Sequence, residues 1–174
     1  SMRALAPQYW EERRSVRPAS VWVTAPDAHY LVLRTDVEVE QQGTINPYIT
    51  AYASYIGLVL DQSLSPDVPL WFRRGFTGVI SNTIVRDDHV LFGAPIPWEL
   101  KILNERPLLT LPKLLSVTRQ SPEANQADKR DVFDAEAWAF VHFLMFADEG
   151  ARADKLNAYV KLVSTGTDAA KAFA

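Results

Sequence analysis

Hydrophobic and polar positions repeat with two different periods along this chain, first that of strands and then that of helices. Residues 20–24 and 30–35 are rich in β-branched and aromatic side chains, and a turn sequence at residues 25–28 separates them. These two segments predict a pair of antiparallel strands. From Pro47 onward, apolar residues recur at helical spacing. The residues that do so are Tyr48, Tyr52, Tyr55, Ile56, Val59 and Leu60. We therefore predict a long helix from Pro47 to about Ser63.

The rest of the chain predicts mostly helices. They are expected at residues 70–80, 95–103, 108–117, 131–146 and 155–163, with a short one at residues 7–14. Asp67 is a candidate N-cap for the helix that follows it. A third strand is expected at residues 89–92, whereas residues 118–130 are polar and resemble a loop.

These elements predict an α+β fold that is mostly helical, in which a small antiparallel sheet packs on a helical bundle. A length of 174 residues suffices for one domain with a core of its own. Residues 1–46 form its strand-rich part and residues 47–174 its helical part. The chain begins with Ser1-Met2 and stops abruptly beside a predicted helix, so we expect a domain excised from a longer protein.

Composition narrows the class of protein. Apolar residues make up 48% of the chain, which indicates a globular domain, and a net charge of −3 without long runs argues against a nucleic-acid partner. The absence of cysteine excludes disulfides and thiolate metal sites. No run approaches the ~18 apolar residues of a membrane-spanning helix, and no signal peptide is visible. Composition assigns neither a compartment nor an oligomeric state.

Two segments carry a resemblance to a known family. The stretch Pro69-Leu70-Trp71-Phe72-Arg73-Arg74-Gly75-Phe76-Thr77 resembles the P-L-W-L-x-E-G-x-A-E-Y helix of gluzincin zinc peptidases, the group that includes the aminopeptidases. The stretch Ala51-Tyr52-Ala53-Ser54-Tyr55 stands where such a peptidase carries H-E-x-x-H. In the aminopeptidase pattern, 18 residues separate the second histidine from the third ligand, and residues 56–73 give the same interval here.

The resemblance implies a peptidase scaffold without its metal ligands. The first histidine becomes Ala51, the general base Tyr52, the second histidine Tyr55 and the glutamate ligand Arg74. Alanine has no donor atom, a neutral phenol is a poor zinc ligand, and an arginine cation repels the ion. Gly78 stands at the second glutamate of the motif, so support for a ligand is missing as well. These positions predict a vestigial site with no zinc and no other cofactor.

A second segment extends the resemblance, which covers roughly residues 30–173. Residues 133–144 resemble the F-Y-A-Q-S-W-A-L-V-H-Y-L helix of bacterial peptidase MA-like domains, with Asp134 in place of the tyrosine. The resemblance implies a pseudopeptidase with a binding or structural role. Its partner would be a peptide or protein in the former substrate cleft, and the family is compatible with an extracytoplasmic location.

Several side chains have more than one interpretation. Tyr52 and Tyr55 either pack along an amphipathic helix or line a residual pocket. Arg74 either is a solvated charge or enters the vacated metal position, where it would pair with Glu136 or Asp134. His142 is expected to be a structural histidine with a hydrogen bond. The candidate pocket comprises Tyr52, Tyr55, Arg74, Asp134, Glu136 and His142. A cleft filled by its own side chains would instead indicate a purely structural module.

The competing hypothesis is an active hydrolase with a non-standard site around His142, Glu136 and Asp134. The three histidines of the chain have no pair at i, i+4, so none of them builds H-E-x-x-H. Asp134 and Glu136 are two residues apart on a predicted helix and do not face each other. The sequence Asp87-Asp88-His89 has metal-binding residue types but is expected to be a surface turn.

Overall fold

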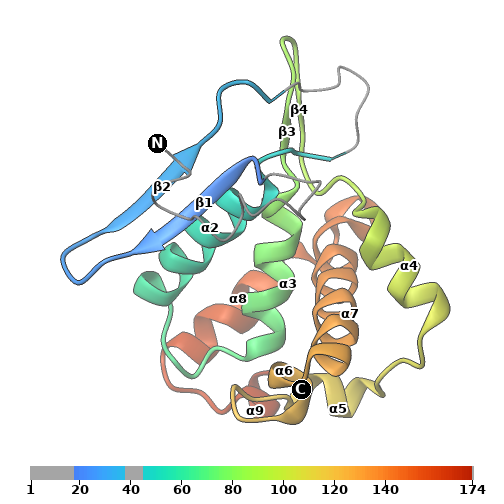
Figure 1. The fold of residues 1–174 in the computed structure, drawn as a ribbon. Coiled ribbons are helices and arrows are strands. Elements are labelled where there is room, and N and C mark those ends of the chain that lie inside the picture. Colours follow the sequence, from blue (N-terminus) through green and yellow to red (C-terminus); the bar gives the residue numbers. More distant parts are fainter. Residues whose placement is uncertain (1–17, 38–44, 174) are drawn as a thin grey trace.

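The computed structural model describes residues 18–37 and 45–173, so the helix predicted at residues 7–14 lies outside the described residues. Strands β1 (Ser20–Thr24) and β2 (His29–Leu33) form the predicted antiparallel hairpin, with Trp22 opposite Leu31. A second, shorter hairpin joins β3 (Ile84–Val85) and β4 (Val90–Leu91). Figure 1 shows the first hairpin beside α2 and the second projecting from the helices.

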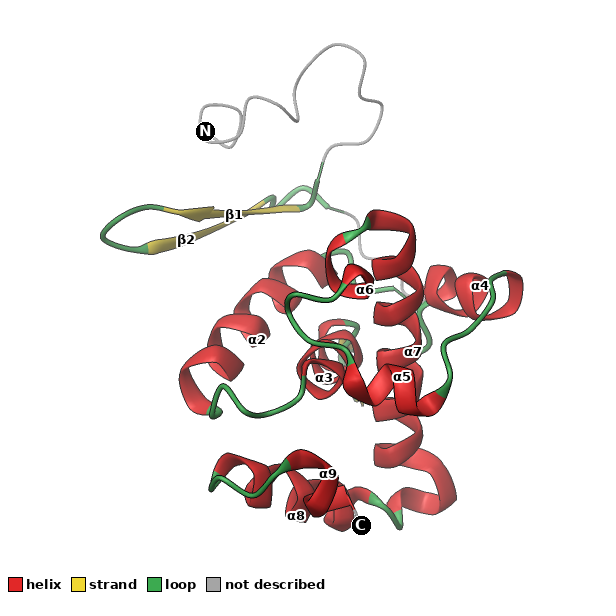
Figure 2. Cartoon of the chain, turned by 90° about the horizontal axis from the view of Figure 1, so that it is seen from below, coloured by secondary structure: helices red, strands yellow, loops and turns green. Residues whose placement is uncertain are grey.

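Helices make up most of the described chain. They are α2 (Ile49–Ser63), α3 (Leu70–Ser81), α4 (Pro97–Glu105), α5 (Leu111–Ser116), α6 (Pro122–Asn125), α7 (Ala127–Phe146), α8 (Ala153–Ser164) and α9 (Ala169–Phe173), with a short 3-10 helix at Ala147–Gly150. The β1–β2 hairpin lies on one side of the bundle, and α8 and α9 lie on the other (Figure 2). The predicted α+β class with a predominance of helix is confirmed.

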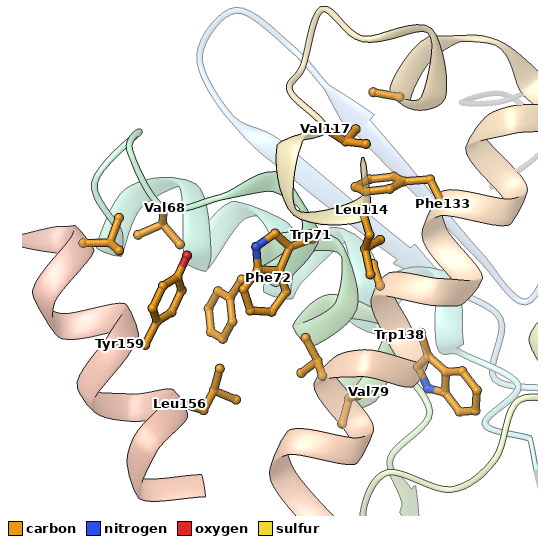
Figure 3. Packing of buried hydrophobic residues seen from close by; sticks show 14 of the residues in the cluster. Val68, Trp71, Phe72, Val79, Leu114, Val117, Phe133, Trp138, Leu156 and Tyr159 are labelled. Atoms are coloured by element: carbon orange, nitrogen blue, oxygen red, sulfur yellow. The ribbon is translucent and has the colours of Figure 1, made fainter. Parts of the chain in front are cut away.

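The core forms where α3 and α7 cross. Trp71 is 1% exposed, and its ring lies 5.1 Å from that of Phe140 and 5.8 Å from that of Tyr159. Figure 3 shows Trp71 and Phe72 of α3 beside α8, whereas the ring of Trp138 lies on the side of α7 away from Tyr159. Trp138 belongs to the same buried cluster, at the end of it that is remote from α8.

Polar side chains fix both ends of α3. The buried guanidinium of Arg73 donates to the carbonyls of residues 60, 64, 65 and 68 at 2.7–3.3 Å, and to the Oδ1 atom of Asp61 at 3.1 Å. At the other end, the side chain of Asn82 accepts from the backbone N–H of Asn46 at 2.8 Å and donates to the carbonyls of Ala94 and Pro95. These bonds hold α2, and the loop before α4, in fixed positions relative to α3.

Two local predictions are wrong, and one short strand was not predicted. Asp67 is not an N-cap, because α3 begins at Leu70 after Pro69 and the carboxylate of Asp67 instead accepts from the hydroxyl of Ser65 at 3.1 Å. Residues 118–130 are not a continuous loop, because α6 begins at Pro122 and α7 begins at Ala127. A proline in the first turn of a helix costs no hydrogen bond, and this allows α6 to start there. The two-residue strand β3 has too few residues to show a period.

Candidate functional site

A groove runs along the surface between α2 and α3. Its wide section, about 550 Å³, is lined among others by Ser54, Gly57 and Asn125. Its second section, about 290 Å³, is lined by residues of α4 and α7 as well, and we call it the tryptophan section. The residues that line the tryptophan section include Arg74, Gly78, Trp98, Glu99, Asp134 and Trp138. Ala53, Arg74 and Thr77 line both sections, so the two adjoin each other.

Small residues form the middle of the face that α2 turns to the groove, between Ile49 at one end and Leu60 and Asp61 at the other. Thr50, Ala53, Ser54 and Gly57 line one section or both. A helix with 3.6 residues per turn brings these positions onto one stripe. Small side chains on this stripe leave space between α2 and α3, and the groove is therefore open rather than filled.

The vestigial positions on α2 do not share this stripe. Tyr52 and Tyr55 are 37% and 56% exposed, and neither lines the two sections. Ala51 is buried. Residues 51, 52 and 55 point away from the stripe because each residue turns the helix by about 100°. Of the four positions that the motif aligns with a metal site, only Arg74 lies in the groove.

Arg74 forms the predicted contact with an acidic residue of α7. Its Nη1 atom lies 3.5 Å from Oδ2 of Asp134, and the two side chains are 44% and 29% exposed. Glu136, the other predicted partner, is buried elsewhere, and its Oε1 atom accepts from the backbone N–H of Leu109 at 2.7 Å. The pair of Arg74 and Asp134 thus lies at the junction of the two sections.

The structure does not assemble the alternative hydrolase site. His142 is half-buried, and its Nε2 atom lies 2.9 Å from the carbonyl oxygen of Gly93. Glu136 binds the backbone of Leu109, and Asp134 pairs with Arg74. Eight residues of helix place His142 and Asp134 about 12 Å apart along α7. The three side chains therefore serve three different contacts.

Two carboxyl groups approach each other in the tryptophan section. Burial and, to a smaller extent, the charge of Asp134 raise the pKa of Glu99 from 4.5 to about 7, whereas a hydrogen bond with Trp98 opposes the shift. Burial also raises the pKa of Asp134, against the effect of Arg74 and Arg130. The sequence analysis missed Glu99 and Trp98. Their only local signal is Pro97-Trp98-Glu99, a helix start with an acidic first turn.

The donor set does not suit zinc. The residues at the positions that the resembled motif gives to ligands are an alanine, a tyrosine that points away and an arginine. Within residues 18–37 and 45–173, no group of three histidine, cysteine, aspartate or glutamate side chains is placed to hold a metal ion. Asp88 and His89 lie at the exposed turn of the β3–β4 hairpin, where Nδ1 of His89 is 2.6 Å from Oδ1 of Asp88. In the same part of the chain, no helix is long and apolar enough to cross a membrane.

Comparison of the chain with family models, with curated proteins and with solved structures gives no match. The groove itself and the resemblance of the motifs are therefore the basis for a functional proposal.

The raised pKa of Glu99 predicts a pH-dependent stability. Between pH 4.5 and pH 7 this carboxyl ionises in the unfolded chain but keeps its proton in the folded one, so the free energy of unfolding falls as the pH rises. We expect Glu99→Gln to remove this fall, which makes the variant more stable than the wild type at pH 8 by on the order of 1–2 kcal/mol. Urea denaturation at pH 5 and pH 8 measures the difference.

Glu105→Gln is the matched control, because Glu105 is an exposed residue at the end of the same helix. It should leave the pH dependence of the wild type unchanged. An equal pH dependence in the wild type and in Glu99→Gln would contradict the assignment.

Proposed function

We propose that this chain is a catalytically inactive metallopeptidase-like domain, and that the groove between α2 and α3 binds a peptide. The observation that carries the proposal is the position of Arg74. It stands at the third-ligand position of the resembled motif, and its guanidinium lies in the groove beside the carboxylate of Asp134. A fixed cation here replaces the positive charge of a metal ion and supplies a hydrogen-bond donor.

Binding is favoured over a purely structural role because the groove is open. The aromatic side chains that would fill it, Tyr52 and Tyr55, lie on another face of α2. The groove also exposes polar groups, among them Ser54, Thr77 and Asn125. An elongated groove with polar side chains along its length suits an extended chain that has a donor and an acceptor at each residue.

Two measurements on the purified domain test the proposal. Elemental analysis after exposure to zinc is expected to find far less than one ion per chain, and zinc is expected to leave the melting temperature unchanged. A mixture of blocked tripeptides with neutral, acidic and basic side chains is expected to shift amide signals of α2 and α3 without being cleaved. A stoichiometric zinc ion that raises the melting temperature, or cleavage of the peptides, would show an enzyme instead.

A pair of substitutions locates the binding. Ala53 lines both sections, so Ala53→Phe should occlude the groove and lower peptide affinity at least tenfold. Val59→Phe adds the same ring to the same helix at an exposed position outside the groove, and it should leave affinity unchanged. Equal affinity of the two variants would exclude the groove as the peptide site.

A further inference from the structure

The tryptophan section has an excess of acidic groups. Glu99 of α4 and Asp134 of α7 both line it, and Arg74 of α3 is the only cation among the described residues that line it. Two further charges of α7 lie near these carboxyl groups. Asp131 raises the pKa of both Glu99 and Asp134, whereas Arg130 lowers the pKa of Asp134. Once Glu99 is ionised, the lining therefore carries one uncompensated negative charge in a partly buried position.

Polar atoms of this section also lack partners. The buried Oδ1 atom of Asp134 has no hydrogen-bond partner within the part of the chain that the structure describes, and the same is true of the indole Nε1 atom of Trp138. Trp138 is 5% exposed, and the edge of its ring beside Nε1 faces Gly78, where a Cβ atom would lie 3.2 Å from Cδ1. A buried donor and a buried acceptor that remain unpaired cost free energy unless a ligand satisfies them.

An exposed aromatic surface adjoins the acidic groups. Trp98 precedes Glu99 in the first turn of α4, lines the section and is 45% exposed. An indole ring beside carboxylates is the combination that proteins use for ammonium and guanidinium groups, because the ring face attracts a cation and the carboxylates neutralise it.

We propose that the tryptophan section binds an organic cation, an ammonium or guanidinium group that lies against Trp98 and contacts Glu99 and Asp134. This inference rests on the proposed function of the groove, and it names the chemistry of one of its ligand groups. A lysine or arginine side chain of a peptide supplies such a group, and the peptide carbonyl beside it supplies an acceptor for Nε1 of Trp138. A free amine supplies the cation alone.

Other ligand classes fit the section less well. An anion would meet two carboxyl groups and an arginine that is already paired with Asp134. A metal ion would find two carboxyl groups, and no group of three suitable side chains exists among the described residues. An organic cation uses both the acidic groups and the indole surface, which neither alternative does.

The test compares three probes on the whole domain by NMR titration of the indole N–H signals. Acetyl-Ala-Lys-Ala-amide is expected to bind at least tenfold more tightly than its norleucine counterpart, which has the same length and no charge. It should shift the signals of Trp98 and Trp138 and leave that of Trp71, which is buried in the core, unchanged. Its affinity should rise at least fivefold from pH 6 to pH 8 as Glu99 ionises. The third probe, 1,5-diaminopentane, is a free amine, and comparison of its affinity with that of the lysine peptide assigns the source of the cation.

Glu99→Gln should remove both the preference for lysine and its pH dependence, whereas Glu105→Gln, on the same helix and outside the groove, should retain them. Equal affinity for the lysine and norleucine peptides would overturn the cation site and leave the groove as a peptide site. No binding of any peptide, and no binding of the diamine, would overturn both proposals. Binding of the diamine alone would support the cation site and contradict a peptide ligand.

Discussion

Gly75→Ala is expected to lower the free energy of unfolding by about 3 kcal/mol or more, and so to leave little folded protein. Gly75 is buried where α3 crosses α7. A Cβ atom there would lie 2.2 Å from the carbonyl oxygen of Ala137 and 2.5 Å from Cγ2 of Val141. Because the nearest atom belongs to the backbone of α7, the clash is relieved only if the two helices move apart. Urea denaturation, or the yield of soluble protein, measures the effect.

Gly57→Ala is the matched control. Gly57 lies within α2, and a Cβ atom there meets nothing within 4 Å. Alanine favours a helix over glycine, so we expect this substitution to raise stability by about 0.5–1 kcal/mol. The propensity gain is the same at both sites, and the difference between the two variants therefore isolates the close approach of α3 to α7. Equal effects of the two substitutions would contradict this helix contact.

Arg73→Met is expected to lower the free energy of unfolding by about 3 kcal/mol. The side chain of Arg73 is 8% exposed, and its guanidinium satisfies carbonyls from the end of α2 and from the loop that leads to α3. Methionine fills much of the same volume but donates no hydrogen bond, so buried carbonyls would lose their partner. Thermal or urea denaturation measures the loss.

Arg119→Met separates these carbonyl bonds from the ion pair. Arg119 and Arg73 both donate to Oδ1 of Asp61 at 3.1 Å, yet the side chain of Arg119 is 62% exposed. An exposed ion pair contributes about 0–1 kcal/mol, so Arg119→Met should have a small effect. If it destabilised the protein as much as Arg73→Met does, the contact with Asp61 would be the important one and the carbonyl bonds would not.

These two positions also explain why the groove has a defined shape. Gly75 allows α3 to approach α7, and the bonds of Arg73 fix the end of α2 relative to α3. The next residue, Arg74, lines the groove between α2 and α3. Arg73 and Arg74 are adjacent and identical in type, but one is a structural residue and the other a groove residue. The sequence analysis gave a role only to Arg74.

Local side-chain patterns were sufficient to predict most of the elements and the class of the fold. Strand β1, the hairpin turn and the long helices α2, α3, α7 and α8 follow from side-chain periods that act over four to eight residues, and the structure matches them within a few residues. The errors fall on the shortest elements, α6 and β3, where few residues are available to set a period. The contact between Arg74 and Asp134 is one of the alternatives that the sequence left open for Arg74, beside a pairing with Glu136 and a solvated charge.

The rest of the candidate site depends on how the helices pack against one another. Which face of α2 borders the groove depends on how that helix is rotated against α3. Because successive residues are about 100° apart around the helix, an alignment error of one or two residues assigns the wrong residues to the groove. Glu99 and Trp98 come from α4, and Asp134 and Trp138 from α7, so no local pattern connects them. The raised pKa of Glu99 results from burial and from the neighbouring charge of Asp134, and both exist only after these helices pack together.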